Sequence, residues 1–200
     1  MKTCLVKSGS LLWISWMLAT LMLPSLAYAH TVAGQTSGFA HGFVHPLTGL
    51  DHIAAMVAVG LWAAQRGGRA VWVVPLTFVS VMSVSGLLGM TGVFIPFVEP
   101  GIAASVFVLG LLIAAAVRLP LVASSLIVGL FAVFHGHAHG AEMPETVSGL
   151  AYGIGFVLAT GLLHCCGIGL GLLAGQLESP RFVRYTGGAT AALGIYLFVT

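Results

Sequence analysis

Residues 70–94 read AVWVVPLTFVSVMSVSGLLGMTGVF, a run of 25 residues in which no side chain is charged. As an α-helix rises 1.5 Å per residue, about 20 apolar residues cross the hydrocarbon of a bilayer. The run does not alternate apolar with polar residues, as a strand of a membrane barrel would. It therefore predicts a transmembrane helix and an all-α fold.

The composition of the whole chain extends this prediction. The chain has 200 residues, 6% of them charged, and its mean hydropathy is +1.07. A soluble domain needs more charge than this to cover its surface, so we expect a lipid environment. We predict a polytopic membrane helix bundle with six transmembrane helices after a cleaved signal peptide, over residues 39–64, 70–94, 101–118, 120–136, 146–168 and 183–199. The connections are short, so we expect chain neighbours to pack antiparallel in one domain.

The N-terminal segment has the pattern of a secretory signal peptide. Lys2 and Lys7 form a positively charged start, and an apolar segment follows over residues 11–23. An Ala-Tyr-Ala cleavage site then ends at residue 29. We therefore divide the chain into a signal peptide over 1–29 and a six-helix transmembrane domain over 30–200. An uncleaved first helix is the alternative.

Charged residues between the predicted helices indicate the orientation. The arginines that would share one side of the membrane are Arg66, Arg69, Arg118, Arg181 and Arg184. The acids that would share the other side are Glu99, Glu142 and Glu145. Arginine-rich loops stay in the cytoplasm, so we expect a multi-pass protein of the bacterial inner membrane with both mature termini in the periplasm. A cleaved signal implies the same orientation.

The charge balance also excludes several classes of function. After residue 29 the arginines and acids balance, so no basic surface remains for a nucleic acid. No lysine remains for a Walker A phosphate loop, so we expect no ATP hydrolysis by the chain itself. We also expect that the protein is not an enzyme. Cys165 and Cys166 are adjacent and rarely bridge to each other, so we expect no structural disulfide.

The first predicted helix carries polar side chains deep in the membrane. Residues 45–52 read HPLTGLDH, and His41 lies one turn earlier. On a straight helix His41, His45 and His52 fall within about 40° of one another, and Asp51 lies about 100° from His52. An aspartate near mid-membrane costs on the order of 3 kcal/mol unless it faces a bundle interior, a partner or water. His45 and His52 would be about 10 Å apart along a straight axis. One ion can reach both only if the helix opens at its proline and glycine; otherwise it steps between two sites. The structural alternative is a simple proline kink with histidines bonded to carbonyls.

A second motif ends the fourth predicted helix. Residues 134–142 read FHGHAHGAE. If they are helical, His135, His139 and Glu142 share one face, whereas His137 points the other way. Two imidazoles and a carboxylate at this spacing form a plausible metal-binding face. The alternative is a solvated polar loop.

Five further side chains are weaker candidates for the path of an ion: Glu99, His41, His137, His164 and His30. Glu99 lies in an apolar turn at the outer side and is either a loop acid or a ligand at the opening of the path. His164 precedes the two cysteines near the inner end of the fifth helix, where small packing residues are equally expected. His30 could chelate through its imidazole and amine if cleavage makes it N-terminal.

At these motifs the sequence resembles the HupE/UreJ family of hydrogenase and urease accessory membrane proteins. The resemblance is carried by residues 45–60 in the first helix and 134–142 after the fourth, with 159–164 as a further likeness. It implies nickel uptake or supply for the maturation of nickel enzymes. It implies functional roles for His45, Asp51, His52, His135, His139 and Glu142, and places His137 at a variable position.

The resulting hypothesis is a secondary permease that imports Ni²⁺ without an organic cofactor. Imidazole and carboxylate suit cobalt, zinc and copper as well, so nickel follows from the resemblance and cobalt is the alternative. A non-transporting nickel-binding accessory or sensor protein is a second class. A membrane di-iron enzyme is a third, and it would need a closed ligand cluster on the cytosolic side. The sequence leaves proton coupling and a homo-oligomer open.

Overall fold

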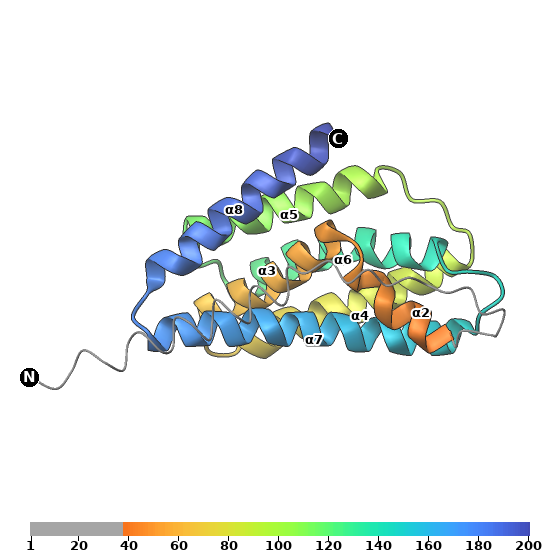
Figure 1. Ribbon diagram of the computed structural model, residues 1–200, viewed down its shortest axis with the longest axis horizontal. Coiled ribbons are helices and arrows are strands. Elements are labelled where there is room, and N and C mark those ends of the chain that lie inside the picture. Colours follow the sequence, from red (N-terminus) through yellow and green to blue (C-terminus); the bar gives the residue numbers. More distant parts are fainter. Residues whose placement is uncertain (1–37) are drawn as a thin grey trace, which may run out of the picture. The chain divides into compact units, whose positions relative to one another are not determined.

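A computed structural model describes residues 38–200, which consist of α-helices, one short 3₁₀-helix and no strand. The elements are α2 (Gly38–Val44), η1 (His45–Leu47), α3 (Leu50–Arg66), α4 (Ala70–Met90), α5 (Val98–Ala114), α6 (Leu121–Ala141), α7 (Gly149–Gln176) and α8 (Pro180–Val199) (Figure 1). The all-α prediction is confirmed for these residues. The predicted signal peptide, its cleavage site and His30 lie outside them.

Four of these helices, α4, α6, α7 and α8, are long and apolar enough to cross a membrane. A fifth candidate span is the pair Gly38–Leu47 and Leu50–Arg66, which is bent by 78° at a short break. Helix α5 is apolar but has only 17 residues. The described chain is therefore a polytopic helical membrane protein, with four candidate spans by length and composition, or five if the bent pair counts as one.

Two helices extend further than the sequence predicts. Helix α6 continues to Ala141, so the histidine motif is helical rather than a loop. Helix α7 continues to Gln176 through several glycines. Glycine lowers helix propensity, but a Cβ at Gly167 would collide with the α3 backbone at Val57. Close packing against α3 therefore holds this glycine-rich segment in the helix.

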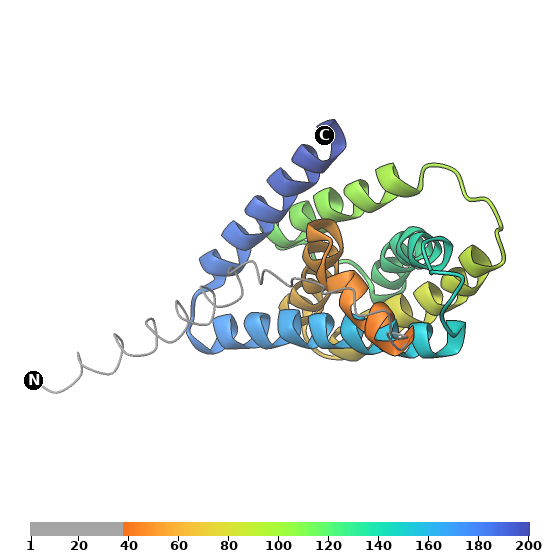
Figure 2. The same cartoon turned by 45° about the vertical axis from the view of Figure 1, so that its right-hand side comes forward.

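The closest helix pairs are not chain neighbours. Helix α4 packs along α6 in the same direction, because Gly136 lies against Met82 and Gly140 lies one turn further against Gly86. Helix α3 runs parallel to α7 in the same way. Helix α5 packs antiparallel against α8, and Figures 1 and 2 both show these two side by side. The expectation of antiparallel packing between chain neighbours thus misses the main contacts, because glycine faces rather than loop lengths decide them.

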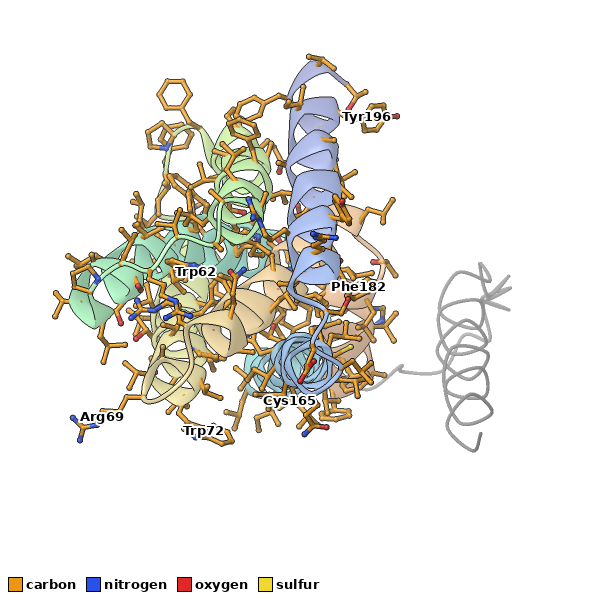
Figure 3. The ribbon with its side chains drawn as sticks, turned by 90° about the vertical axis from the view of Figure 1, so that its left-hand side faces the viewer. Trp62, Arg69, Trp72, Cys165, Phe182 and Tyr196 are labelled. Atoms are coloured by element: carbon orange, nitrogen blue, oxygen red, sulfur yellow. The ribbon has the colours of Figure 1, made fainter. Side chains whose placement is uncertain are left out.

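Several arginines mark one end of the bundle. Arg66 at the end of α3 donates to the Ser124 hydroxyl at the start of α6. The Arg184 Nε at the start of α8 donates to the Ala114 carbonyl at the end of α5, at 2.8 Å. Arg69 points away from the helices at the turn before α4 (Figure 3). The ends that carry these arginines therefore meet at one side, which we call the arginine end.

Candidate metal-binding site

The first predicted helix is broken between its two histidines. Pro46 lies in the 3₁₀ turn, and the Thr48 amide and hydroxyl both donate to the His45 carbonyl, at 3.1 and 2.7 Å. Gly49 is extended, with φ −92° and ψ 120°, and α3 begins at the next residue. Proline removes one helical hydrogen bond and the extended glycine ends the turn. Of the two options that the sequence leaves open, the opened helix is confirmed.

Beyond the break, Asp51 and His52 form a tight pair. The Asp51 Oδ1 accepts from the His52 backbone amide at 2.8 Å and from its ring Nδ1 at 2.7 Å. A carboxylate can only accept, so the proton lies on Nδ1 and the lone pair on Nε2. The Nε2 atom is buried and has no hydrogen-bond partner. A carboxylate behind a histidine orients such rings in metal sites, so this geometry would let His52 bind a metal through Nε2.

Two histidines of α6 face this pair. The His135 Nδ1 donates to the Phe131 carbonyl at 3.0 Å, which leaves its buried Nε2 without a partner. Both ring nitrogens of His139 are buried without a partner. The His52 ring lies 5.1 Å from that of His135 and 4.3 Å from that of His139, measured between centroids. The i, i+4 face predicted for α6 therefore meets the start of α3.

The remaining two predicted ligands complete the group at its outer side. The His45 Nε2 lies 3.0 Å from the Glu142 carboxylate, and the His45 ring lies 4.6 Å from that of His139. The structure thus brings together all six residues, which we call the ligand cluster: His45, Asp51, His52, His135, His139 and Glu142.

Exposure falls steadily through the ligand cluster. The Glu142 side chain is 53% exposed and that of His45 is 32% exposed. Asp51 follows at 23% and His52 at 13%. His139 and His135 are fully buried. The cluster is therefore accessible at the end opposite the arginines and closed toward the interior of the bundle.

The cluster is a series of neighbouring pairs rather than a closed cage. Within residues 38–200, no group of three His, Cys, Asp or Glu side chains is arranged to hold one metal ion together. Structural metal sites usually fix four ligands around the ion.

The weaker candidates take separate positions. Glu99 lines a cavity of about 230 Å³ together with Asp51, so it lies on an approach to the cluster. His137 points away, and its Nε2 donates to the Val93 carbonyl at 2.6 Å, in agreement with its predicted direction. His41 is exposed on α2.

His164 is buried on α7, and its ring lies 5.1 Å from that of Phe78, measured between centroids. It makes no ring contact with the six ligands among the described contacts, so it lies outside the ligand cluster.

Residues on α7 near the cluster were not predicted from the sequence. The Tyr152 ring lies 6.2 Å from that of His45, and the Phe156 ring lies 4.0 Å from that of His139. The sequence does contain a pattern that could have indicated them. Tyr152, Phe156, Thr160 and His164 follow one another at four-residue spacing, and all four are buried. Polar side chains that recur on one face of an apolar helix indicate an interior stripe.

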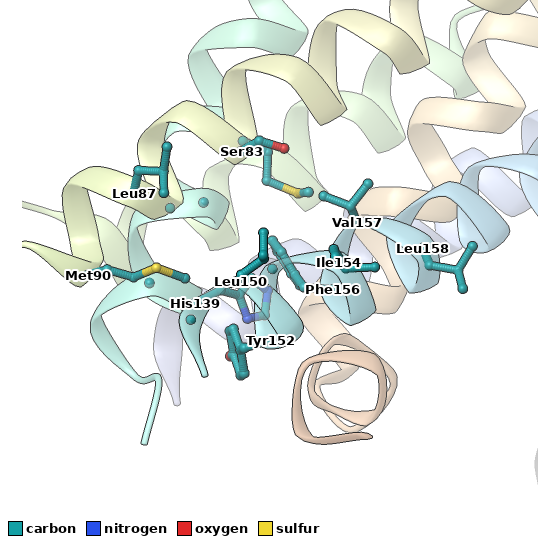
Figure 4. Close-up of a pocket in the computed structure, with 16 residues that line it drawn as sticks. Ser83, Leu87, Met90, His139, Leu150, Tyr152, Ile154, Phe156, Val157 and Leu158 are labelled. Carbon is teal, nitrogen blue, oxygen red and sulfur yellow. The ribbon is translucent and has the colours of Figure 1, made fainter. Parts of the chain in front are cut away.

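A groove of about 690 Å³ runs between α4, α6 and α7 and reaches this region. His139 and Tyr152 lie at its wall beside Phe156, whereas Leu87, Leu150 and Leu158 form its apolar rim (Figure 4). The groove is apolar apart from these few groups, so it presents a lipid-facing side of the cluster rather than a second polar opening.

Apolar helices around a partly buried cluster of histidines and carboxylates define a polytopic membrane protein with a polar site within its helix bundle. The family model described as HupE / UreJ protein matches residues 18–197, and the chain belongs to this family. Protein HupE of Rhizobium leguminosarum bv. viciae is 47% identical over 186 residues, which cover 93% of this chain and 97% of that protein. No solved structure was found to match the chain. The resemblance seen in the two motifs is confirmed.

Proposed function

We propose that the protein is a secondary permease that imports Ni²⁺ across the bacterial inner membrane and supplies the maturation of nickel enzymes such as hydrogenase or urease. Membership of the HupE / UreJ family supports an accessory, transport-type role. The ion is the transported substrate. No organic cofactor enters the proposal.

One observation carries this proposal. Six side chains that can bind a transition metal converge from η1, α3 and α6, and their exposure falls from Glu142 inward to His135. In lipid, ionisable side chains are expensive and occur where they face an interior path or a partner. The His52 and His135 rings keep an unpaired Nε2 toward this interior, which is the atom that binds a metal.

The helix directions support six crossings. Helices α4 and α6 are parallel, so α5 between them returns in the opposite direction despite its 17 residues. Helices α3 and α7 are parallel with three helices between them. We place the bent α2–η1–α3 segment as the first crossing and the arginine end in the cytoplasm. Both ends of the mature domain and Glu142 then face the periplasm.

Inward movement of the ion needs no ATP in this scheme. The membrane potential contributes about 2.3 kcal/mol per charge for each 100 mV, or about 4.6 kcal/mol for a dication. Asp51 carries a negative charge that lowers the cost of the ion at this depth. Glu142 and His45 would take the hydrated ion first, and His139, His52 and His135 would replace its water as it descends.

The choice of nickel as the transported metal rests on membership of the HupE / UreJ family. The donor set of imidazole and carboxylate also binds cobalt, zinc and copper, so cobalt is the runner-up substrate. A second candidate function is a membrane nickel-binding accessory or sensor protein that does not transport. Accumulation of nickel separates the two, because only a permease carries the ion across the membrane.

The test is accumulation of labelled nickel in cells without other nickel uptake. The cells express wild type, Asp51→Ala or, as a matched acidic control, Glu145→Ala, at equal membrane levels. Glu145 is exposed and outside the ligand cluster. We expect uptake by the wild type and Glu145→Ala and its loss in Asp51→Ala. A well-expressed wild type that accumulates no nickel refutes the permease and leaves the accessory protein.

A further inference from the structure

His164 is a buried histidine that the ligand cluster does not include. It lies in the middle of α7, is 2% exposed, and both of its ring nitrogens are buried without a hydrogen-bond partner among residues 38–200. Buried polar groups are hydrogen-bonded in the great majority of cases, because an unpaired one costs about 1–3 kcal/mol. A histidine that stays buried and unpaired inside an apolar helix indicates a function that uses an unpaired ring nitrogen.

The ring of Phe78 contacts both this histidine and the cluster. Its centroid lies 5.4 Å from that of His135 and 5.1 Å from that of His164, both with the rings steeply inclined. Phe78 itself is fully buried on α4. One apolar ring thus contacts both the last histidine of the cluster and the next imidazole.

The position of His164 along the bundle continues the direction of the cluster. Its carbonyl lies against Gly60 of α3, which follows His52 by eight residues. At 1.5 Å per residue this places the backbone of His164 about 12 Å beyond His52 toward the arginine end. Arg66 follows after about 9 Å more. His164 is therefore between the cluster and the inner side.

One buried face of helix α7 runs from the level of the ligand cluster to the level of His164. Phe156 contacts His139, and the Thr160 hydroxyl donates to the Met82 sulfur at 3.7 Å, one turn before His164. Beyond this level the bundle is filled with fully buried apolar side chains, among them Trp62 and Ile113. The cluster is thus accessible from its exposed Glu142 end. Between His164 and the arginine end, apolar side chains close the interior of the bundle.

We infer that His164 is an inner binding step for the transported divalent cation, reached when the ring of Phe78 moves aside. This inference rests on the proposed permease function. Phe78 acts as the hydrophobic barrier between two levels of imidazole, as apolar constrictions gate other pores. The ion leaves Nε2 of His135, passes the ring, and takes the free nitrogen of His164 before release at the arginine end. No covalent bond changes; only ligands exchange.

The experiment compares the concentration dependence of nickel uptake in wild type and His164→Leu, which keeps the bulk but removes both nitrogens. The matched control is Ile168→Ala, one turn further on α7, where a buried side chain is cut back without loss of a ligand. We expect His164→Leu to lower the maximal uptake rate at least tenfold, with the half-saturating concentration within about threefold of wild type. Ile168→Ala should retain more than half of the wild-type rate. Wild-type rates in His164→Leu, or an equal loss in Ile168→Ala, overturn the inference.

A second pair of variants keeps the test decisive if His164→Leu reaches the membrane poorly. His164→Cys and His164→Ser have nearly the same size, but a thiolate binds nickel far better than a hydroxyl. We expect at least fivefold faster uptake by the cysteine variant, and equal rates overturn the inference. Equilibrium binding of nickel to the purified full chain separates the two proposals. A wild type that binds but never accumulates nickel defeats the permease and, with it, the inner step. A transporting wild type matched by His164→Leu defeats only the inner step.

Discussion

The substitution Gly49→Ala tests the geometry of the cluster, because the added methyl group would clash with the Asp51–His52 pair. With φ −92° and ψ 120°, Gly49 has a backbone that any residue adopts, so alanine adds no strain to the chain. A Cβ at this position would lie 2.6 Å from Asp51 Oδ1 and 3.0 Å from His52 Nδ1. The carboxylate must therefore move.

The size of the effect follows from what holds that carboxylate. It accepts two hydrogen bonds from His52, at 2.8 and 2.7 Å, so it cannot shift freely. A hydrogen bond to a charged group contributes about 1.5–3 kcal/mol. Loss of one such bond corresponds to a change of roughly 10- to 100-fold in affinity. We expect Gly49→Ala to raise the half-saturating nickel concentration by this factor while the charge of the protein stays the same.

The assay is the initial rate of labelled nickel uptake over a range of concentrations, at matched membrane levels. Gly153→Ala is the control, because a Cβ at Gly153 on α7 meets nothing within 4 Å. It should behave as wild type. If Gly49→Ala transports with the half-saturating concentration of the wild type, the Asp51–His52 pair does not hold the ion and the reasoning fails.

Three further outcomes are expected. Gly140→Val places side-chain atoms against the backbone of α4, so we expect the protein to lose about 1–3 kcal/mol of stability, measured as a lower unfolding temperature in detergent. An unchanged unfolding temperature would show that α4 and α6 pack less closely than described. His135→Asn should lower nickel uptake at least tenfold, whereas His137→Asn should keep more than half of it, because only the former turns its free nitrogen toward the cluster; equal effects in uptake assays contradict this assignment. Cys165→Ser with Cys166→Ser should leave nickel uptake within about twofold of wild type, since both thiols are exposed outside the cluster; a large loss would place a thiolate on the exit path.

Much of the candidate site could be predicted from the sequence because its residues come in two short motifs. Local spacing on a helix decides which side chains share a face, and His135 and His139 follow that rule, whereas Glu142 caps the end of the helix and contacts His45. The break after His45 was one of two options, since proline and glycine permit an opened helix without requiring it. The part that α7 contributes was missed, because Tyr152 and Phe156 look like ordinary membrane residues until the helix is placed.

Composition determined that the chain lies in a membrane, and its long apolar runs without alternation determined that it is helical, because a backbone in lipid must satisfy its polar groups within helices or a closed barrel. The sequence also identified the candidate ligands, because charged and imidazole side chains within an apolar run are costly in lipid and are kept where they have a function. Only the tertiary structure decided that the two motifs meet. That contact depends on parallel packing of α4 with α6 and of α3 with α7, where glycines such as Gly136 and Gly167 let two backbones approach. Pairing of helices far apart in the chain is set by the fit of whole faces, which no local pattern contains.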